Sequence, residues 1–114
     1  MSERQHDFYI GFLGATASSF QAGNMDGAAG FMRIMYQPFV KILLQTKSFL
    51  QASNGVRPGI IKTYVKYTLE KLLVKYGFYF TSKQVESRYY DFWTAFILKD
   101  SKIQQIMQQQ SGVQ

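Results

Sequence analysis

The sequence predicts an all-α protein: a small bundle of three to four helices in a single domain that spans residues 1–114. Two observations lead to this prediction. Apolar residues recur at helical spacing along most of the chain, and glycine-marked turns separate the periodic segments. The chain is 46% hydrophobic and 17% aromatic, so it is too apolar for the disordered class and can form a core.

The first helix is predicted from Asp7, as N-cap, to Gln21. Gly11 and Gly14 weaken this helix, and the following segment AGNMDGAAG is predicted to break it. Residues 1–27 are therefore equally open to a second interpretation, a glycine-rich arm that is mobile or packs on a partner. The predicted apolar stripe comprises Phe8, Phe12, Ala15 and Phe20.

The second helical pattern is stronger and runs from about residue 28 to residue 52, before the turn SNGVRPG. Proline lacks a backbone N–H, so Pro38 either kinks this helix or begins a new helix as its first residue. The predicted core face comprises Phe31, Met32, Met35, Phe39, Ile42, Leu43, Thr46, Phe49 and Leu50.

The third helix is predicted in the stretch KTYVKYTLEKLLVKYGFYF, with Gly77 as its C-terminal cap. Residues 60–80 are also rich in β-branched and aromatic residues, so strands remain an alternative. The opposite face is unusual because it mixes tyrosines with lysines. The predicted core stripe comprises Ile61, Val65, Leu69, Leu72, Leu73 and Tyr76.

The fourth helix is predicted to begin at a capping box formed by Thr81 and Gln84. Trp93 is placed at the edge of its apolar stripe, and residues 108–114 are expected to form a frayed tail. The stripe itself comprises Val85, Tyr89, Phe92, Phe96, Ile103 and Met107.

The net charge of +6 is unevenly distributed: residues 1–26 carry −2, residues 27–69 carry +6 without a single acid, and residues 70–114 carry +2. An acid-free basic segment is typical of proteins that bind a polyanion. A solvated basic face that only keeps the protein soluble is the alternative. The expected phosphate-backbone contacts are Arg33, Lys41, Lys47, Arg57, Lys62 and Lys66, followed by Lys71 and Lys75.

Two tyrosines accompany these cations. Tyr64 and Tyr67 are expected to stack on bases or sugars, or to pack in the core or on a neighbouring subunit. A helix-turn-helix is a further alternative, in which the fourth helix presents Lys83, Gln84, Ser87 and Arg88 to a major groove.

The sequence contains few groups for catalysis. It has no cysteine and one histidine, His6, so thiolate metal sites and nucleophilic triads lack their parts. Glu86 and Asp91, with Arg88 between them, are better explained as helix-surface ion pairs than as a catalytic acid pair. We therefore expect no enzymatic activity, no metal and no cofactor.

These features together predict a non-enzymatic structural subunit that oligomerises along DNA or RNA, as in a coat protein or a small helical subunit of a nucleoprotein complex. The expected partner is nucleic acid, single- or double-stranded, bound without sequence preference. A protein-only scaffold within a larger assembly is the main alternative. We expect no membrane span, no signal peptide and an intracellular location or a nucleoprotein particle, because no apolar run is long enough and residues 1–7 are not basic.

Overall fold

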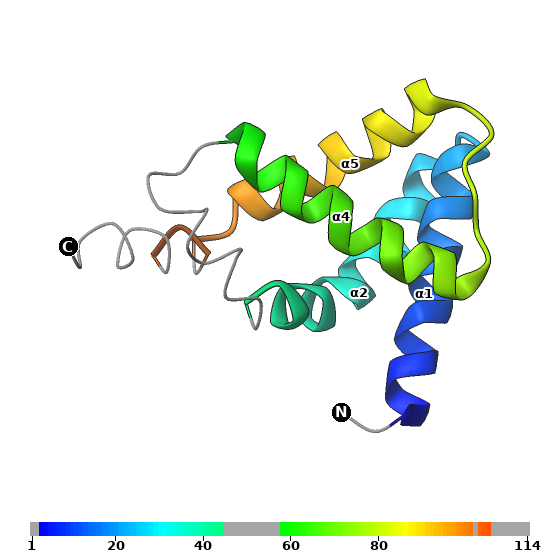
Figure 1. The fold of residues 1–114 in the computed structure, drawn as a ribbon, viewed down its shortest axis with the longest axis horizontal. Coiled ribbons are helices and arrows are strands. Elements are labelled where there is room, and N and C mark those ends of the chain that lie inside the picture. The colour runs from blue at the N-terminus through cyan, green and yellow to red at the C-terminus, as the bar shows by residue number, and fades with distance from the viewer. Residues whose placement is uncertain (1–2, 45–57, 102, 106–114) are drawn as a thin grey trace.

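The computed structural model describes residues 3–44, 58–101 and 103–105. Within these ranges the chain is helical and has no strand, so the predicted all-α bundle is confirmed (Figure 1). Two helical hairpins, α1–α2 and α4–α5, pack together, and α4 crosses α1 near its own C-terminal end. The helices are α1 (Glu3–Gln21), α2 (Met25–Leu44), α4 (Pro58–Tyr76) and α5 (Lys83–Leu98).

Helix α1 begins four residues before the predicted start and turns a different face to the core. Phe8 is 60% exposed, so its place in the predicted stripe is wrong, although Phe20 is buried as expected. The helical period alone does not say on which side the neighbouring helices lie, and here they lie on the side of Leu13 and Ala17. The partner-packing or mobile arm over residues 1–27 stays a prediction.

The turn after α1 is shorter than predicted, because only residues 22–24 leave the helical conformation. Gly23 has a φ of +81°, which favours glycine, and the side chain of Asn24 accepts a hydrogen bond from the Gly27 amide at 3.0 Å. This interaction starts α2 early. The predicted helix break is therefore confirmed at residues 22–24, but its predicted extent to residue 30 is wrong, because Gly27 and Gly30 lie inside α2.

Helix α2 continues through Pro38, so no second helix begins there. The missing proline N–H leaves the carbonyl of Ile34 without its helical donor, and Pro38 itself is buried within the bundle. Residues 45–57, where the predicted helix ended and the turn followed, lie outside the described residues. The buried side chains of α2 include Met32, Met35, Phe39 and Leu43.

Residues 60–76 lie in α4, so the helix prediction is confirmed and the strand alternative is wrong for them. The core stripe of α4 is confirmed at Ile61, Val65, Leu69 and Leu73, and Gly77 (φ +86°) ends the helix as predicted, donating to the carbonyl of Leu73. The assignment of Tyr76 to the core is wrong. Tyr76 is 48% exposed because it lies in the last turn, where its ring contacts the backbone of Gly14 in α1 rather than the bundle interior.

Helix α5 has a different N-cap from the one predicted. Ser82, not Thr81, caps it and accepts a hydrogen bond from the Val85 amide. The amide of Thr81 instead donates to the Gln21 side chain at 2.9 Å, which fixes the end of α1 against the α4–α5 turn. Trp93 is fully buried rather than at the edge of the stripe, because its ring packs on Phe39 of α2 at 4.8 Å between centroids.

Residues that follow α5 contribute to the core of the bundle. The hydroxyl of Tyr36 in α2 donates to Asp100 Oδ2, and Asp100 Oδ1 accepts from the Ile103 amide at 3.2 Å. Asp100 thus caps a short helical segment that buries Ile103. Burial, with the nearby Asp100 carboxylate, raises the pKa of Tyr36.

Candidate ligand-binding surfaces on α4

The outer face of α4 carries exposed cations beside an exposed ring. Tyr67, Lys71 and Lys75 follow one another at intervals of four residues, so they form one line along the helix, which we call the Tyr67–Lys75 face. Tyr67 is 56% exposed, and the ammonium of Lys71 lies 4.3 Å from the centre of its ring. This face spans about 12 Å of helix axis.

The other predicted cations of α4 have partners within the protein. Lys62 forms an ion pair of 2.7 Å with Asp91 and a hydrogen bond of 3.3 Å with Ser87, so it joins α4 to α5. Lys66 is exposed and lies 4.0 Å from Glu70 one turn later. The sequence predicted that Asp91 would pair with Arg88 on the surface of its own helix. In the structure Asp91 pairs with Lys62 of another helix instead.

The structure divides the acid-free basic segment between two helices. Arg33 and Lys41 are exposed on α2, whereas Lys62 and Lys66 belong to α4. Lys47 and Arg57 lie outside the described residues. Tyr64 is half-buried and packs against the core, unlike Tyr67.

The helix-turn-helix alternative concerns the first two turns of α5. Six residues, 77–82, separate α4 from α5. All four predicted groove-facing residues are exposed in this structure: Lys83, Gln84, Ser87 and Arg88.

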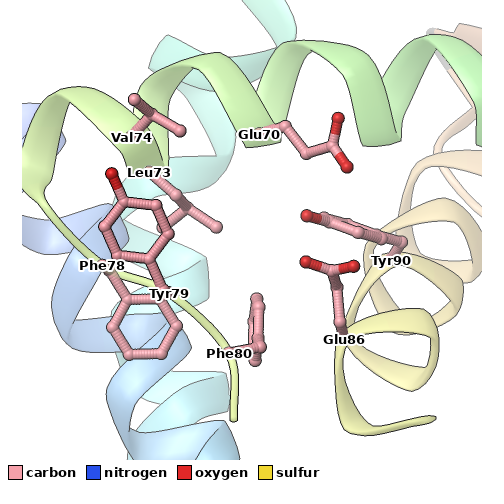
Figure 2. A pocket seen from close by; sticks show the side chains of 8 residues that line it. All are labelled: Glu70, Leu73, Val74, Phe78, Tyr79, Phe80, Glu86 and Tyr90. Carbon is pink, nitrogen blue, oxygen red and sulfur yellow. The ribbon is translucent and has the colours of Figure 1, made fainter. Parts of the chain in front are cut away.

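A pocket of about 270 Å³ lies between α4, the 78–80 segment and α5. Figure 2 shows the carboxylates of Glu70 from α4 and Glu86 from α5 on either side of the Tyr90 hydroxyl. The Tyr90 side chain is buried, and burial followed by the charges of Glu86 and Glu70 raises its pKa. The remaining lining residues are apolar or aromatic: Leu73, Val74, Phe78, Tyr79 and Phe80.

Sequence reasoning missed this pair of carboxylates, because it considered Glu86 together with Asp91. Glu70 and Glu86 are sixteen residues apart on different helices, and only the turn at residues 77–82 brings them together. A usable signal was that Glu70 is the sole acid in its helix and lies beside the apolar stripe rather than opposite it.

Comparison with protein-family models, with curated proteins and with solved structures gives no match for this chain. None of the described helices is both long and apolar enough to cross a membrane. Within the same residues, no three acidic, histidine or cysteine side chains gather in a way that could hold a metal ion.

Proposed function

We propose that the protein is a non-enzymatic structural subunit that binds nucleic acid without sequence preference, and that the Tyr67–Lys75 face contacts the phosphate backbone. The observation that carries the proposal is the alignment of an exposed tyrosine with two exposed lysines on one side of α4. Lysines supply sequence-independent affinity by releasing counterions, and an exposed ring adds stacking on an unpaired base. Lys66, Arg33 and Lys41 are further exposed cations that would extend the contact.

Fluorescence anisotropy with a labelled single strand and a labelled duplex, at about 50 mM and about 200 mM salt, tests this proposal. Three lysine–phosphate contacts on a single strand give a slope of log affinity against log salt of about −2, which is a loss of roughly twenty-fold between these conditions. Absence of binding to both probes at the lower salt concentration would overturn the proposal and leave the protein-only scaffold.

Two matched double variants locate the contact. Lys71→Gln with Lys75→Gln is expected to reduce the magnitude of the single-strand salt slope by about 1.4, at roughly 0.7 per lysine. Lys83→Gln with Arg88→Gln changes the net charge equally but alters α5, and is expected to leave the slope unchanged. The opposite result would favour the helix-turn-helix regulator. All four side chains are exposed, so the fold should tolerate both variants.

Oligomerisation along the nucleic acid is the second part of the proposal. Large apolar side chains exposed on single chains support it, since neighbouring copies would cover them. Light scattering with and without the bound strand measures this directly, and a monomer in both conditions would exclude a coat-like role. The described residues of this kind are Phe8, Met25, Ile34, Tyr67, Val74, Tyr76 and Tyr79.

A further inference from the structure

The lining of the pocket of about 270 Å³ includes none of Tyr67, Lys71 and Lys75, so the proposed nucleic-acid contact does not use it. A cavity of about 150 Å³ holds a benzene molecule, so this pocket has room for a small organic group of somewhat greater size. Its walls come from two helices and the segment between them, so the α4–α5 hairpin forms it on its own.

One end of the pocket is polar and acidic, and the other end is mainly apolar. Figure 2 shows Glu70, Glu86 and the Tyr90 hydroxyl at one end, with Leu73, Phe78 and Tyr79 at the other. The rings of Phe78 and Phe80 stand edge to face, with centroids 4.9 Å apart, and line the apolar part. A ligand that matches both ends has a cationic head and an apolar body.

The acidic end has unused hydrogen-bonding capacity. Among the described residues, Glu86 forms no ion pair, and Glu70 has only the 4.0 Å approach of Lys66, one turn earlier in α4. The buried hydroxyl of Tyr90 has a single hydrogen to donate, and it has lone pairs that can accept. A donor-rich cation placed between the two carboxylates would also remove their mutual repulsion.

Guanidinium fits this end better than other cations. It is planar, presents five N–H donors in a rigid fork, stacks on aromatic faces and is weakly hydrated. An ammonium is a more strongly hydrated point charge, with a higher cost of entering a partly apolar pocket. A divalent metal ion on two carboxylates would keep several water ligands, and a hydrated ion does not match the apolar end of the pocket.

We propose that this pocket binds an alkylguanidinium group, with the guanidinium between Glu70, Glu86 and Tyr90 and the alkyl stem against Leu73 and Phe78. The group is either a free small guanidine or the side chain of an arginine in a peptide. Both share one chemistry at the carboxylate end.

Titration with propylguanidinium, followed by ¹H–¹⁵N NMR spectra of the full chain, tests the proposal. We expect saturable shifts at the amides of Phe78, Tyr79, Phe80 and Glu86. Glu86→Gln should weaken binding by about tenfold or more, because it removes one charge-assisted contact. Glu3→Gln changes the net charge equally at an exposed position in α1, and should leave binding unchanged.

Two further probes sharpen the result. Propylammonium has the same stem and charge, and we expect it to bind about tenfold more weakly. A Gly-Arg-Gly peptide that binds more tightly than propylguanidinium points to an arginine of a protein partner, whereas equal or weaker binding points to a free guanidine. Should Glu86→Gln lose its native spectrum, Glu70→Gln replaces it, with the same expected loss. The proposal is overturned if propylguanidinium causes no saturable shift, if Glu3→Gln weakens binding as much as the pocket variants, or if propylammonium binds equally well.

Discussion

Two polar atoms lie in the core without a hydrogen-bond partner among the described residues: the hydroxyl of Tyr89 and the indole nitrogen of Trp93. They belong to one face of α5, four residues apart, and both side chains are fully buried. Burial raises the pKa of Tyr89. An unsatisfied buried hydroxyl costs stability, so its removal should not harm the fold.

Tyr89→Phe is therefore expected to leave the free energy of unfolding unchanged or to raise it by about 1 kcal/mol. Tyr36→Phe makes the same chemical change but removes the hydrogen bond to the Asp100 carboxylate, and should lower stability by about 1.5–3 kcal/mol. Urea denaturation of both variants measures the contrast. A loss above about 1 kcal/mol for Tyr89→Phe would show that its hydroxyl has a partner.

Individual residues also show where the helical period fails to predict burial. The helical period placed Leu69 and Leu73 correctly in the core, because a buried stripe must repeat every three or four residues. It placed Phe8 and Tyr76 wrongly, because both have core-like spacing but lie where the neighbouring helices do not extend over them. Which end of a stripe is covered depends on the crossing of helices, and the period contains no information about that.

At the scale of elements, the α1–α4 crossing depends on one glycine. A Cβ at Gly14 would overlap the ring of Tyr76, whereas one at Gly11, a turn earlier in α1, would meet nothing within 4 Å. Glycine is used at residue 14 because it admits this close approach of the two helices.

We expect Gly11→Ala to stabilise the protein by about 0.5–1 kcal/mol, the gain in helix propensity alone. Gly14→Ala has the same gain but must displace the Tyr76 ring, so it should be less stable than Gly11→Ala. Thermal denaturation compares the two variants. The double variant Gly14→Ala with Tyr76→Ala removes the overlap, so it should be more stable than Tyr76→Ala alone by the gain in helix propensity. Equal stability of Gly11→Ala and Gly14→Ala would contradict this account.

The two candidate sites differ in how well the sequence alone could predict them. The Tyr67–Lys75 face lies within one helix, so spacing along the sequence was enough to align Lys71 and Lys75. Glu70 of α4 and Glu86 of α5 both line the pocket, so its geometry depends on the end of α4 at Gly77 and the start of α5 at Ser82. The sequence pattern predicted the first cap but placed the second one residue too early.

For the whole molecule, alkaline pH is expected to weaken the fold. Burial raises the pKa of Tyr36, Tyr89 and Tyr90 above the ordinary value of 10.0, so the folded state keeps these protons where the unfolded chain releases them. The unfolded state then binds fewer protons, and the free energy of unfolding falls as pH rises above about 10. Below about pH 9 both states keep these protons, and this contribution is constant.

Urea midpoints at about pH 8 and about pH 10.5 measure the loss, and tyrosinate absorbance should rise together with the loss of helical circular dichroism. The variant Tyr36→Phe with Tyr90→Phe removes two of the three groups and should show a weaker pH dependence. An unchanged midpoint of the original protein across this range would contradict the expectation.

The hydrogen bond between Tyr36 and Asp100 also has a consequence for synthesis on the ribosome, because it joins residues 64 positions apart. At roughly 5–20 residues per second, residue 100 follows residue 36 by roughly 3–13 s. During that interval the apolar face of α2, with Met35 and Phe39, has α1 beside it but not Trp93. The nascent α1–α2 hairpin therefore exposes this face until α5 is complete, and it is during these seconds that the chain most needs protection from aggregation.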